Sequence, residues 1–235
     1  MGYIIKRIFN AFIVLWIVIT ITFFLMHAIP GGPFTAEKSL SPYVLHSIEE
    51  RYKLNDPLYK QYGDYLCNLV QGDLGPSFKY PGRSVNDIIK DGFPVSFKLG
   101  IEAILIAIII GIPAGILAGV KKDKWQDRAV NFFTTLGVAV PSFVVAALLI
   151  YVLSTKLHLL PAAMWNGWRY EIMPALALSG MPMSFIARLT RSSMLDILSQ
   201  DYIKTARAKG LSWSKVLIKH ALPNSLIPVV TYLGT

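Results

Sequence analysis

The sequence is poor in charge, cysteine and histidine. Only 16% of its 235 residues are charged and 54% are hydrophobic, whereas an ordinary soluble domain carries about 25% charged residues. A soluble chain of this length could not bury so much apolar surface, so lipid is the expected solvent. Cys67 is the single cysteine, which excludes an internal disulfide. The four histidines are far apart and none has a ligand spacing, so we expect neither a metal site nor a cofactor.

The sequence also lacks the signatures of a catalytic chain. It contains no GxxxxGK[ST] phosphate-binding loop. No Ser-His-Asp arrangement and no pair of carboxylates is evident, and the apolar segments hold almost no acids. We therefore expect a protein that is not an enzyme and that takes any energy it needs from another polypeptide.

Long apolar runs are what the sequence does have. A membrane-spanning helix needs about 20 mostly apolar residues. Four runs qualify or nearly qualify, namely Ile8–Ile29, Leu99–Val120, Ala129–Leu153 and Ile172–Ala187. The first is too long for the apolar region of a signal peptide, so we interpret it as a retained anchor. These runs predict an all-α, polytopic membrane helix bundle.

The last residues of the chain are apolar as well. Residues 225–235 resemble the beginning of a further span, but they number only 11, about half of what a span requires. We expect the chain to be truncated at its C-terminus.

Basic residues are distributed unevenly between the predicted spans. With the N-terminus in the cytoplasm, the inner segments hold 13 basic and 4 acidic residues, and the outer segments hold 10 of each. Because Lys and Arg are enriched on the cytoplasmic side of membrane proteins, this distribution predicts a cytoplasmic N-terminus. The location is then the cell membrane, or the inner membrane in an organism that has two.

Two features of the second span suggest contacts. Gly111, Gly115 and Gly119 form two overlapping GxxxG steps, which allow another helix to approach closely. Helix packing is favoured over a direct role in a pore. Near the outer boundary, Lys98 and Glu102 are spaced to pair with each other or to snorkel, with a substrate contact less favoured.

Residues 30–96 form a long outer segment with helix signals. Ser41 with Pro42, and Asp56 with Pro57, are typical helix starts, and Gly72 is a typical helix stop. A capping box of Ser84 and Asp87 precedes an expected short helix. The segment either covers the bundle or forms a docking surface for an outside partner. The predicted domains are residues 1–30, 31–94 and 95–235.

A basic segment at residues 191–223 interrupts the apolar character on the inner side. Met194, Leu198, Tyr202 and Ala206 recur every four residues and predict one helical stripe. Gly210 would end that helix, Ser212 would cap a second one through Trp213, Val216 and Leu217, and Pro223 would end the second.

Three kinds of partner could bind this basic segment. DNA is disfavoured because the segment is tethered near the bilayer at both ends, so we expect no nucleic-acid partner. Anionic lipid would explain the charge alone. A protein partner would also explain the small residues Ala206, Ala208 and Gly210, which permit close approach.

The same segment resembles the EAA loop of membrane subunits of ATP-binding-cassette (ABC) importers. Anchored on Gly210, the pattern matches Ala206, Leu222 and Pro223 and departs at Lys204, Thr205 and His220. The departures resemble the dipeptide and oligopeptide permeases, where "DYIKTARAKGL" and "KHALPN" have close counterparts. The stretches "YKLNDPLYKQY", "GDLGPSFKY", "GFPVSFKLG", "VPSFVVA" and "IARLTRSSM" extend the resemblance to the B-type permease subunit over nearly the whole chain.

The resemblance implies a type I ABC importer transmembrane domain and a set of partners. These are a second homologous permease subunit, two ABC ATPase subunits on the inner side, an extracytoplasmic peptide-binding protein, the lipid bilayer and a peptide substrate. The family usually has six spans, so the last and most of another would be absent here. Substrate-binding residues are not identified by the resemblance. The residues implied in coupling to the ATPases are Lys204, Thr205, Ala206, Arg207, Ala208, Lys209, Gly210, Leu211, Ser212, Leu222 and Pro223.

Other functions stay open at the level of sequence. Dipeptide and nickel permeases share much of the pattern. An ATP-independent secondary transporter or channel usually places ionisable residues in mid-membrane, and none is clearly there. A membrane-anchored scaffold or receptor would move no solute.

Overall fold

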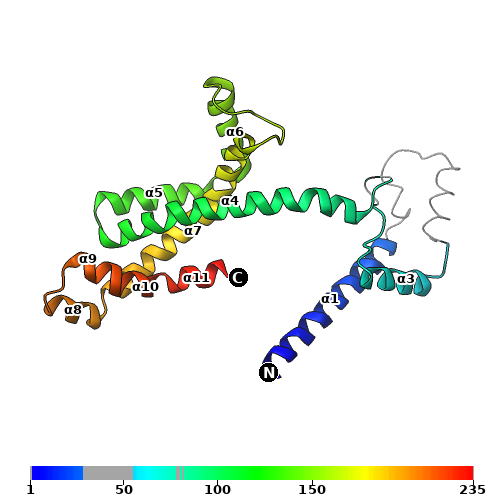
Figure 1. Cartoon of the computed structure of the whole chain (residues 1–235), viewed down its shortest axis with the longest axis horizontal. Coiled ribbons are helices and arrows are strands. Elements are labelled where there is room, and N and C mark those ends of the chain that lie inside the picture. The colour runs from blue at the N-terminus through cyan, green and yellow to red at the C-terminus, as the bar shows by residue number, and fades with distance from the viewer. Residues whose placement is uncertain (1, 29–54, 78–79, 81, 235) are drawn as a thin grey trace. The chain divides into compact units, whose positions relative to one another are not determined.

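The computed structural model describes residues 2–28, 55–77, 80 and 82–234. These residues form helices and no strand, apart from one isolated bridge between Pro76 and Ser84, so the all-α prediction is confirmed (Figure 1). The chain divides into two compact units, residues 1–93 and residues 94–235. In the described part, four helices are long and apolar enough to cross a membrane, or five if one bent helix pair counts as a span.

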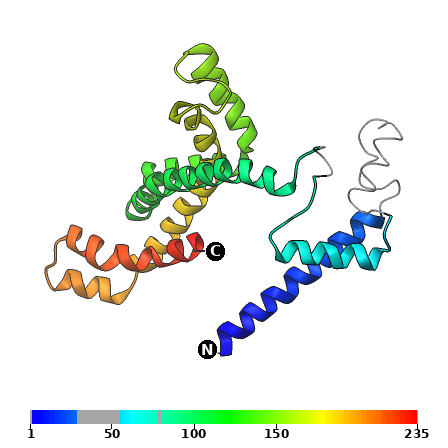
Figure 2. The same ribbon diagram turned by 45° about the vertical axis from the view of Figure 1, so that its right-hand side comes forward.

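The first unit pairs an apolar helix with a short amphipathic one. Helix α1, Gly2–Ala28, contains the predicted first span up to Ala28. Helix α3, Leu58–Val70, lies across it (Figure 2). The Phe23 ring stacks at 5.6 Å from that of Tyr65, and the hydroxyls of Thr20 and Tyr62 are 2.6 Å apart. Aromatic contacts of this kind join α3 to the last turns of α1.

The outer helix signals are only partly tested. The predicted helix that begins at Ser41 and Pro42 lies outside the described residues. Helix α3 begins one residue later than predicted, with Pro57 at the N-cap position. It ends as predicted at Gly72, whose φ of 80° is left-handed and whose N–H donates to the Leu69 carbonyl at 3.0 Å.

Helix α4, Val85–Val120, differs from the prediction in length. The capping box at its start is confirmed, because Ser84 N–H donates to the Asp87 carboxylate at 3.1 Å and Asp87 N–H donates to Ser84 Oγ at 3.0 Å. The helix that follows is not short, and the predicted span Leu99–Val120 forms its C-terminal part. Helix α4 continues through Pro94. The Lys90 carbonyl, which loses its helical donor there, belongs to an exposed turn where water can bond it.

The predicted third span, Ala129–Leu153, is divided between two helices that are bent against each other. Helix α5 spans Trp125–Ala139, and helix α6, Ser142–Leu149, continues into the π-helix η1, Ile150–Lys156. The two parts are bent by 103°. The break lies at Pro141, which has no N–H to continue the ladder and adopts an extended ψ of 142°.

Helix α7, Ile172–Leu198, runs 11 residues beyond the predicted end of the fourth span at Ala187. Pro174 lies in its first turn, where a missing N–H costs little, and Pro182 lies inside the helix. The extension continues because Arg188 and Arg191 find polar partners on α5 within the bundle.

The chain ends in a further helical run. Helix α8 spans Asp201–Ala208 and helix α9 spans Trp213–Val216. A π-helix η3, Leu217–Ala221, leads into α10, Leu222–Ser225, and then α11, Ile227–Leu233. The prediction that Pro223 ends the helix was wrong, since residues 213–233 form one apolar run. The π turn widens the helix just before Pro223, so the proline is accommodated at the start of α10.

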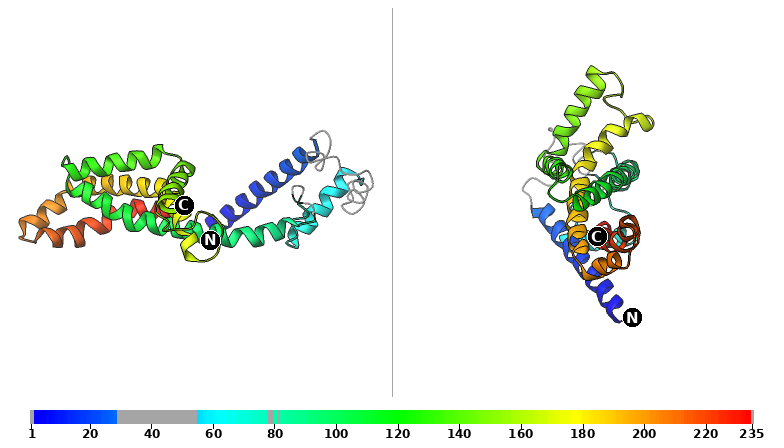
Figure 3. Two further views of the ribbon diagram at one scale, coloured as in Figure 1. Left: turned by 90° about the horizontal axis from the view of Figure 1, so that it is seen from above. Right: turned by 90° about the vertical axis from the view of Figure 1, so that its left-hand side faces the viewer.

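In the second unit, α4, α5 and α7 run alongside one another (Figure 3). A Cβ placed on Gly111, Gly115 or Gly119 would lie within 2.8 Å of an atom of α7. For Gly115 this atom is the Ala187 carbonyl oxygen, at 2.5 Å. The three glycines therefore occupy the face of α4 that contacts α7, and they bring the two backbones into direct contact.

Candidate functional site

The candidate site is the basic corner, which we define as residues 199–223. Helix α8 ends in a Schellman motif around Gly210, whose φ is 81°. Gly210 N–H donates to the Arg207 carbonyl at 2.9 Å, and Leu211 N–H donates to the Ala206 carbonyl at 3.3 Å. These two bonds satisfy carbonyls that the helix end would leave free, and the left-handed residue turns the chain into α9.

Ser212 lies at the N-cap of α9, where the sequence placed it. Its backbone is extended, and its carbonyl accepts the Val216 N–H at 3.0 Å. The side chain makes no capping hydrogen bond. The helix start therefore depends on backbone geometry and on the packing of Val216.

The predicted stripe through Met194, Leu198, Tyr202 and Ala206 was wrong as a feature of one helix. The chain bends at residues 199–200, between α7 and α8. In α8 the buried side chains are Ile203 and Ala206, while Tyr202 is 41% exposed. Residues before and after the bend thus face the same core, but the four-residue spacing of buried side chains does not continue from α7 into α8.

Five buried side chains form one core between the basic corner and the end of α7. They come from α7, α8, α9 and η3, and they are Met194, Ile203, Ala206, Val216 and Ala221. Ile116 and Val120, at the end of α4, pack against them. The corner therefore stands on the ends of α4 and α7 as one packed body.

Two further contacts brace the corner on its surface. The Arg207 guanidinium lies 5.2 Å from the centre of the Trp213 ring, which joins α8 to α9 by a cation–π contact. Tyr202 Oη accepts a hydrogen bond from Asn224 Nδ2 at 3.0 Å, which joins α8 to α10. Both contacts cross the turn at Gly210, so the two helices are held at a fixed angle.

The outward face of the corner is cationic with an apolar part. Lys204 pairs with Asp201 at 2.8 Å, and this hydrogen bond lowers the pKa of the Asp201 carboxyl below its ordinary value. Leu211 and Trp213 are 36% and 40% exposed. Of the residues implied in coupling, Ala206 turns inward and Leu222 is half-buried. The exposed ones are Lys204, Thr205, Arg207, Ala208, Lys209, Gly210, Leu211, Ser212 and Pro223.

Two polar contacts near the ends of the bundle were not predicted. Lys98 does not pair with Glu102 as one interpretation had it; its Nζ donates to a Glu171 carboxylate oxygen at 2.7 Å. At the other end, Asp127 pairs with Arg191. Both pairs join residues more than 60 positions apart, so no local spacing indicated them. Among the described residues, no three His, Cys, Asp or Glu side chains come together as metal ligands.

Two family models match this chain. One, described as "Binding-protein-dependent transport system inner membrane component", covers residues 111–235 and includes the basic corner. The other, for the N-terminal part of such membrane components, covers residues 1–100. The chain belongs to the binding-protein-dependent transport family.

Curated members of the transport family are similar to the chain over almost all of its length. The oligopeptide transport system permease protein OppB of Haemophilus influenzae is 47% identical over 234 residues, which is 99% of this chain and 76% of that protein. The dipeptide transport system permease protein DppB of Bacillus subtilis is 46% identical over 233 residues, again 99% and 76%. The DppB protein of Lactococcus lactis is 40% identical over 232 residues.

The resemblance inferred from the sequence is thereby confirmed. Members of this transport family are membrane components of ABC importers, and the chain is a permease subunit of that kind with the type I transmembrane fold. Its several membrane-spanning helices agree with an inner membrane component.

Proposed function

We propose that this permease subunit carries oligopeptides inward across the membrane, driven by separate ATPase subunits that grip the basic corner. The observation that carries this proposal is the corner itself. Its helices are held at a fixed angle by the Gly210 turn and share one core with the ends of α4 and α7. A displacement of such a rigid body is passed to the spans without being absorbed by the turn.

The chemistry of the corner suits a protein partner. Lys204, Arg207 and Lys209 provide a cationic rim, and Leu211 adds an apolar contact. Aromatic and Arg side chains beside an apolar patch are typical of protein interfaces. The chain bends at residues 199–200, after the end of α7. This bend supports residues 199–223 as the proposed coupling segment in place of 191–223.

The proposed orientation has the N-terminus and the basic corner in the cytoplasm. The distribution of Lys and Arg supports it, with 13 basic and 4 acidic residues in the inner segments. In this orientation α3 and the turns after it lie outside the cell. They are then available to a peptide-binding protein that delivers the substrate, and a second, homologous permease subunit completes the pathway.

The substrate proposal comes from the printed functions of the relatives. The similar proteins are named as oligopeptide and dipeptide permeases, so peptides are the proposed cargo, with dipeptides the alternative within the same family.

The test is reconstitution of the complex in proteoliposomes with its second permease subunit, two ATPases and binding protein. We expect uptake of a labelled pentapeptide that requires both ATP and the binding protein. We also expect ATP hydrolysis only when the ATPase subunits are present, because this chain has no phosphate-binding loop. Uptake that survives ATP depletion but stops when an ion gradient is dissipated would instead identify a secondary transporter.

A further inference from the structure

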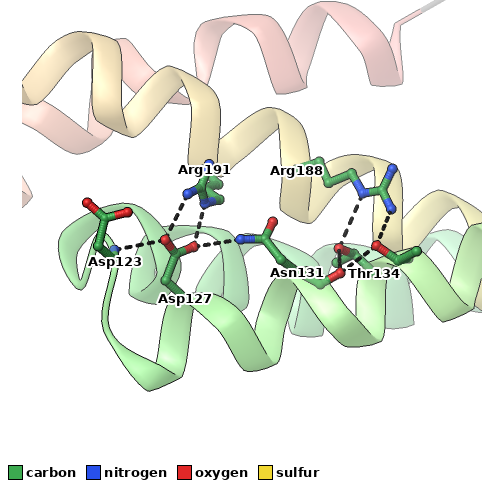
Figure 4. A network of polar contacts seen from close by, with 7 residues as sticks. Asp123, Asp127, Asn131, Thr134, Arg188 and Arg191 are labelled. Carbon is green, nitrogen blue, oxygen red and sulfur yellow. Dashed lines mark hydrogen bonds and ion pairs between the residues drawn. The ribbon is translucent and has the colours of Figure 1, made fainter.

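A network of polar side chains joins α5 to α7 beside the basic corner (Figure 4). Its centre is Asp127, in the first turn of α5, whose side chain is only 4% exposed. The two Asp127 oxygens accept hydrogen bonds from Arg191 Nε at 2.5 Å and from Arg191 Nη2 at 2.8 Å. They also accept from Asn131 Nδ2 at 2.9 Å and from the Asp123 backbone N–H at 3.0 Å.

The Asp127 carboxylate is fully occupied by these contacts. A carboxylate offers about four lone-pair positions, and four donors fill them here. One donor belongs to Asp123, whose φ of 62° is left-handed and unusual for a residue other than glycine. The same carboxylate therefore holds the turn between α4 and α5 and the guanidinium of α7.

A second arginine extends the joint along the two helices. Arg188 Nε donates to Thr134 Oγ1 at 3.2 Å, and Arg188 Nη2 donates to Thr135 Oγ1 at 3.1 Å. Arg188 and Arg191 are three residues apart and lie on one side of α7. Polar contacts therefore join α5 to α7 at the end of the two helices nearest the basic corner. We define the α5–α7 joint as the residues that make them, namely Asp127, Asn131, Thr134, Thr135, Arg188 and Arg191.

The α5–α7 joint lies between the contact of α4 with α7 and the core of the basic corner. Arg191 lies where α4 touches α7, because a Cβ on Gly115 would be 3.1 Å from the Arg191 nitrogen. One turn later, Met194 enters the core of the basic corner. The ends of α4 and α7 and the corner therefore form one body, and the Asp127–Arg191 pair is the charged contact by which α5 is attached to it.

We propose that Asp127 and Arg191 are positioning residues of the transport cycle. The pair passes a displacement of the basic corner to α5, and so to the bend at Pro141 and helix α6. This inference rests on the proposed function. Stability does not require an ion pair at such a position, because a buried ion pair can often be replaced by apolar residues of similar volume without loss of stability. What a bidentate Arg–carboxylate pair adds is a fixed geometry.

The experiment compares variants in the reconstituted complex by the amount of peptide taken up per ATP hydrolysed. Arg191→Lys keeps the charge but loses the bidentate geometry. The double variant Asp127→Leu/Arg191→Met replaces both charges with apolar side chains. In both we expect assembled complexes that still hydrolyse ATP, with uptake per ATP reduced about tenfold, which is a typical size for coupling between sites.

Arg128→Lys is the matched control, because Arg128 is the exposed neighbour of Asp127 on the same helix. We expect its uptake per ATP to equal that of the unmodified complex. An assembled Arg191→Lys or double variant with the unmodified ratio would overturn the inference. If neither variant is recovered in the membrane complex, the pair is a folding element and the inference is equally rejected. Failure of the unmodified complex to show ATP-driven uptake would count against the proposed function instead.

Discussion

The angle of the basic corner depends on one residue, Gly210. Its φ of 81° is in the left-handed region, and a Cβ built on it would meet nothing within 4 Å. A side chain at this position is therefore disfavoured by backbone strain and not by a clash. Because left-handed backbone costs an L-residue roughly 1–2 kcal/mol, the chain would relax toward another turn and change the angle between α8 and α9.

Substitution of Gly210 tests the rigid corner directly. In Gly210→Val we expect normal amounts of the subunit in the membrane, retained ATP hydrolysis and a severalfold loss of peptide uptake, measured in the reconstituted complex. Gly92→Val is the control, since Gly92 is helical, lies in open space and has no positive φ. Unaltered uptake in the Gly210 variant would contradict the proposed role of the corner.

At the residue scale, local signals were predictable and distant partners were not. Gly72, Gly210 and the Ser84–Asp87 box depend on neighbours a few positions away, and the sequence identified all of them. By contrast, Arg191 and Asp127 are separated by 64 positions. No spacing rule connects them, and only the packing of α5 on α7 brings them together.

At the scale of elements, the contact of α4 with α7 is a packing of backbones. A Cβ on Gly115 would lie 2.5 Å from the Ala187 carbonyl oxygen and 2.6 Å from Thr190 Cβ. The first is a backbone atom of α7 and the second is bonded directly to its backbone, so neither atom can move away by a side-chain rotation. Any side chain at Gly115 must therefore push the two helices apart.

We accordingly expect Gly115→Ala to destabilise the protein by about 1–3 kcal/mol, the usual range for overpacking. Gly100→Ala, in the same helix but with nothing within 4 Å of the new Cβ, is the control and should be neutral or slightly stabilising. The measurement is the thermal unfolding midpoint of the purified complex in detergent. Equal midpoints for the two variants would show that α4 and α7 separate at no cost.

The lengths of the elements were the least predictable part of the fold. Hydropathy located the apolar parts of α1, α4 and α7, but it could not show that α4 begins at Val85 or that α7 continues to Leu198. Pro141 lies in an uninterrupted apolar run, so hydropathy carried no sign of a 103° bend. Pro223 was expected to end a helix, yet the π turn before it lets the helix continue.

At the scale of the whole molecule, the uneven distribution of Lys and Arg predicts an orientation in the membrane that can be measured. The single cysteine, Cys67, is exposed on α3, which the proposed orientation places outside the cytoplasm. A membrane-impermeant maleimide should therefore label Cys67 in intact spheroplasts. In a Cys67→Ser background, Lys209→Cys should be labelled only after permeabilisation. The reverse pattern of labelling would invert the topology and remove the corner from the ATPases.

The all-α membrane class could be predicted from composition, because a helix satisfies its own backbone hydrogen bonds within lipid. Family membership followed from motifs spread along the chain. The α5–α7 joint could not be predicted, since its partners are polar residues in segments that the sequence presented as loop and span.

The π turn at Leu217–Ala221 also affects how the helices after it, α10 and α11, are rotated about their axis. Each residue added to or removed from a helix turns everything beyond it by about 100°. The number of residues between Gly210 and Pro223 therefore decides which side of α11 faces α7, where the Tyr232 ring now lies 4.6 Å from that of Phe185. The length of this connection therefore determines the rotation of the last helix, and a connection one residue shorter would turn α11 by about 100° relative to the bundle.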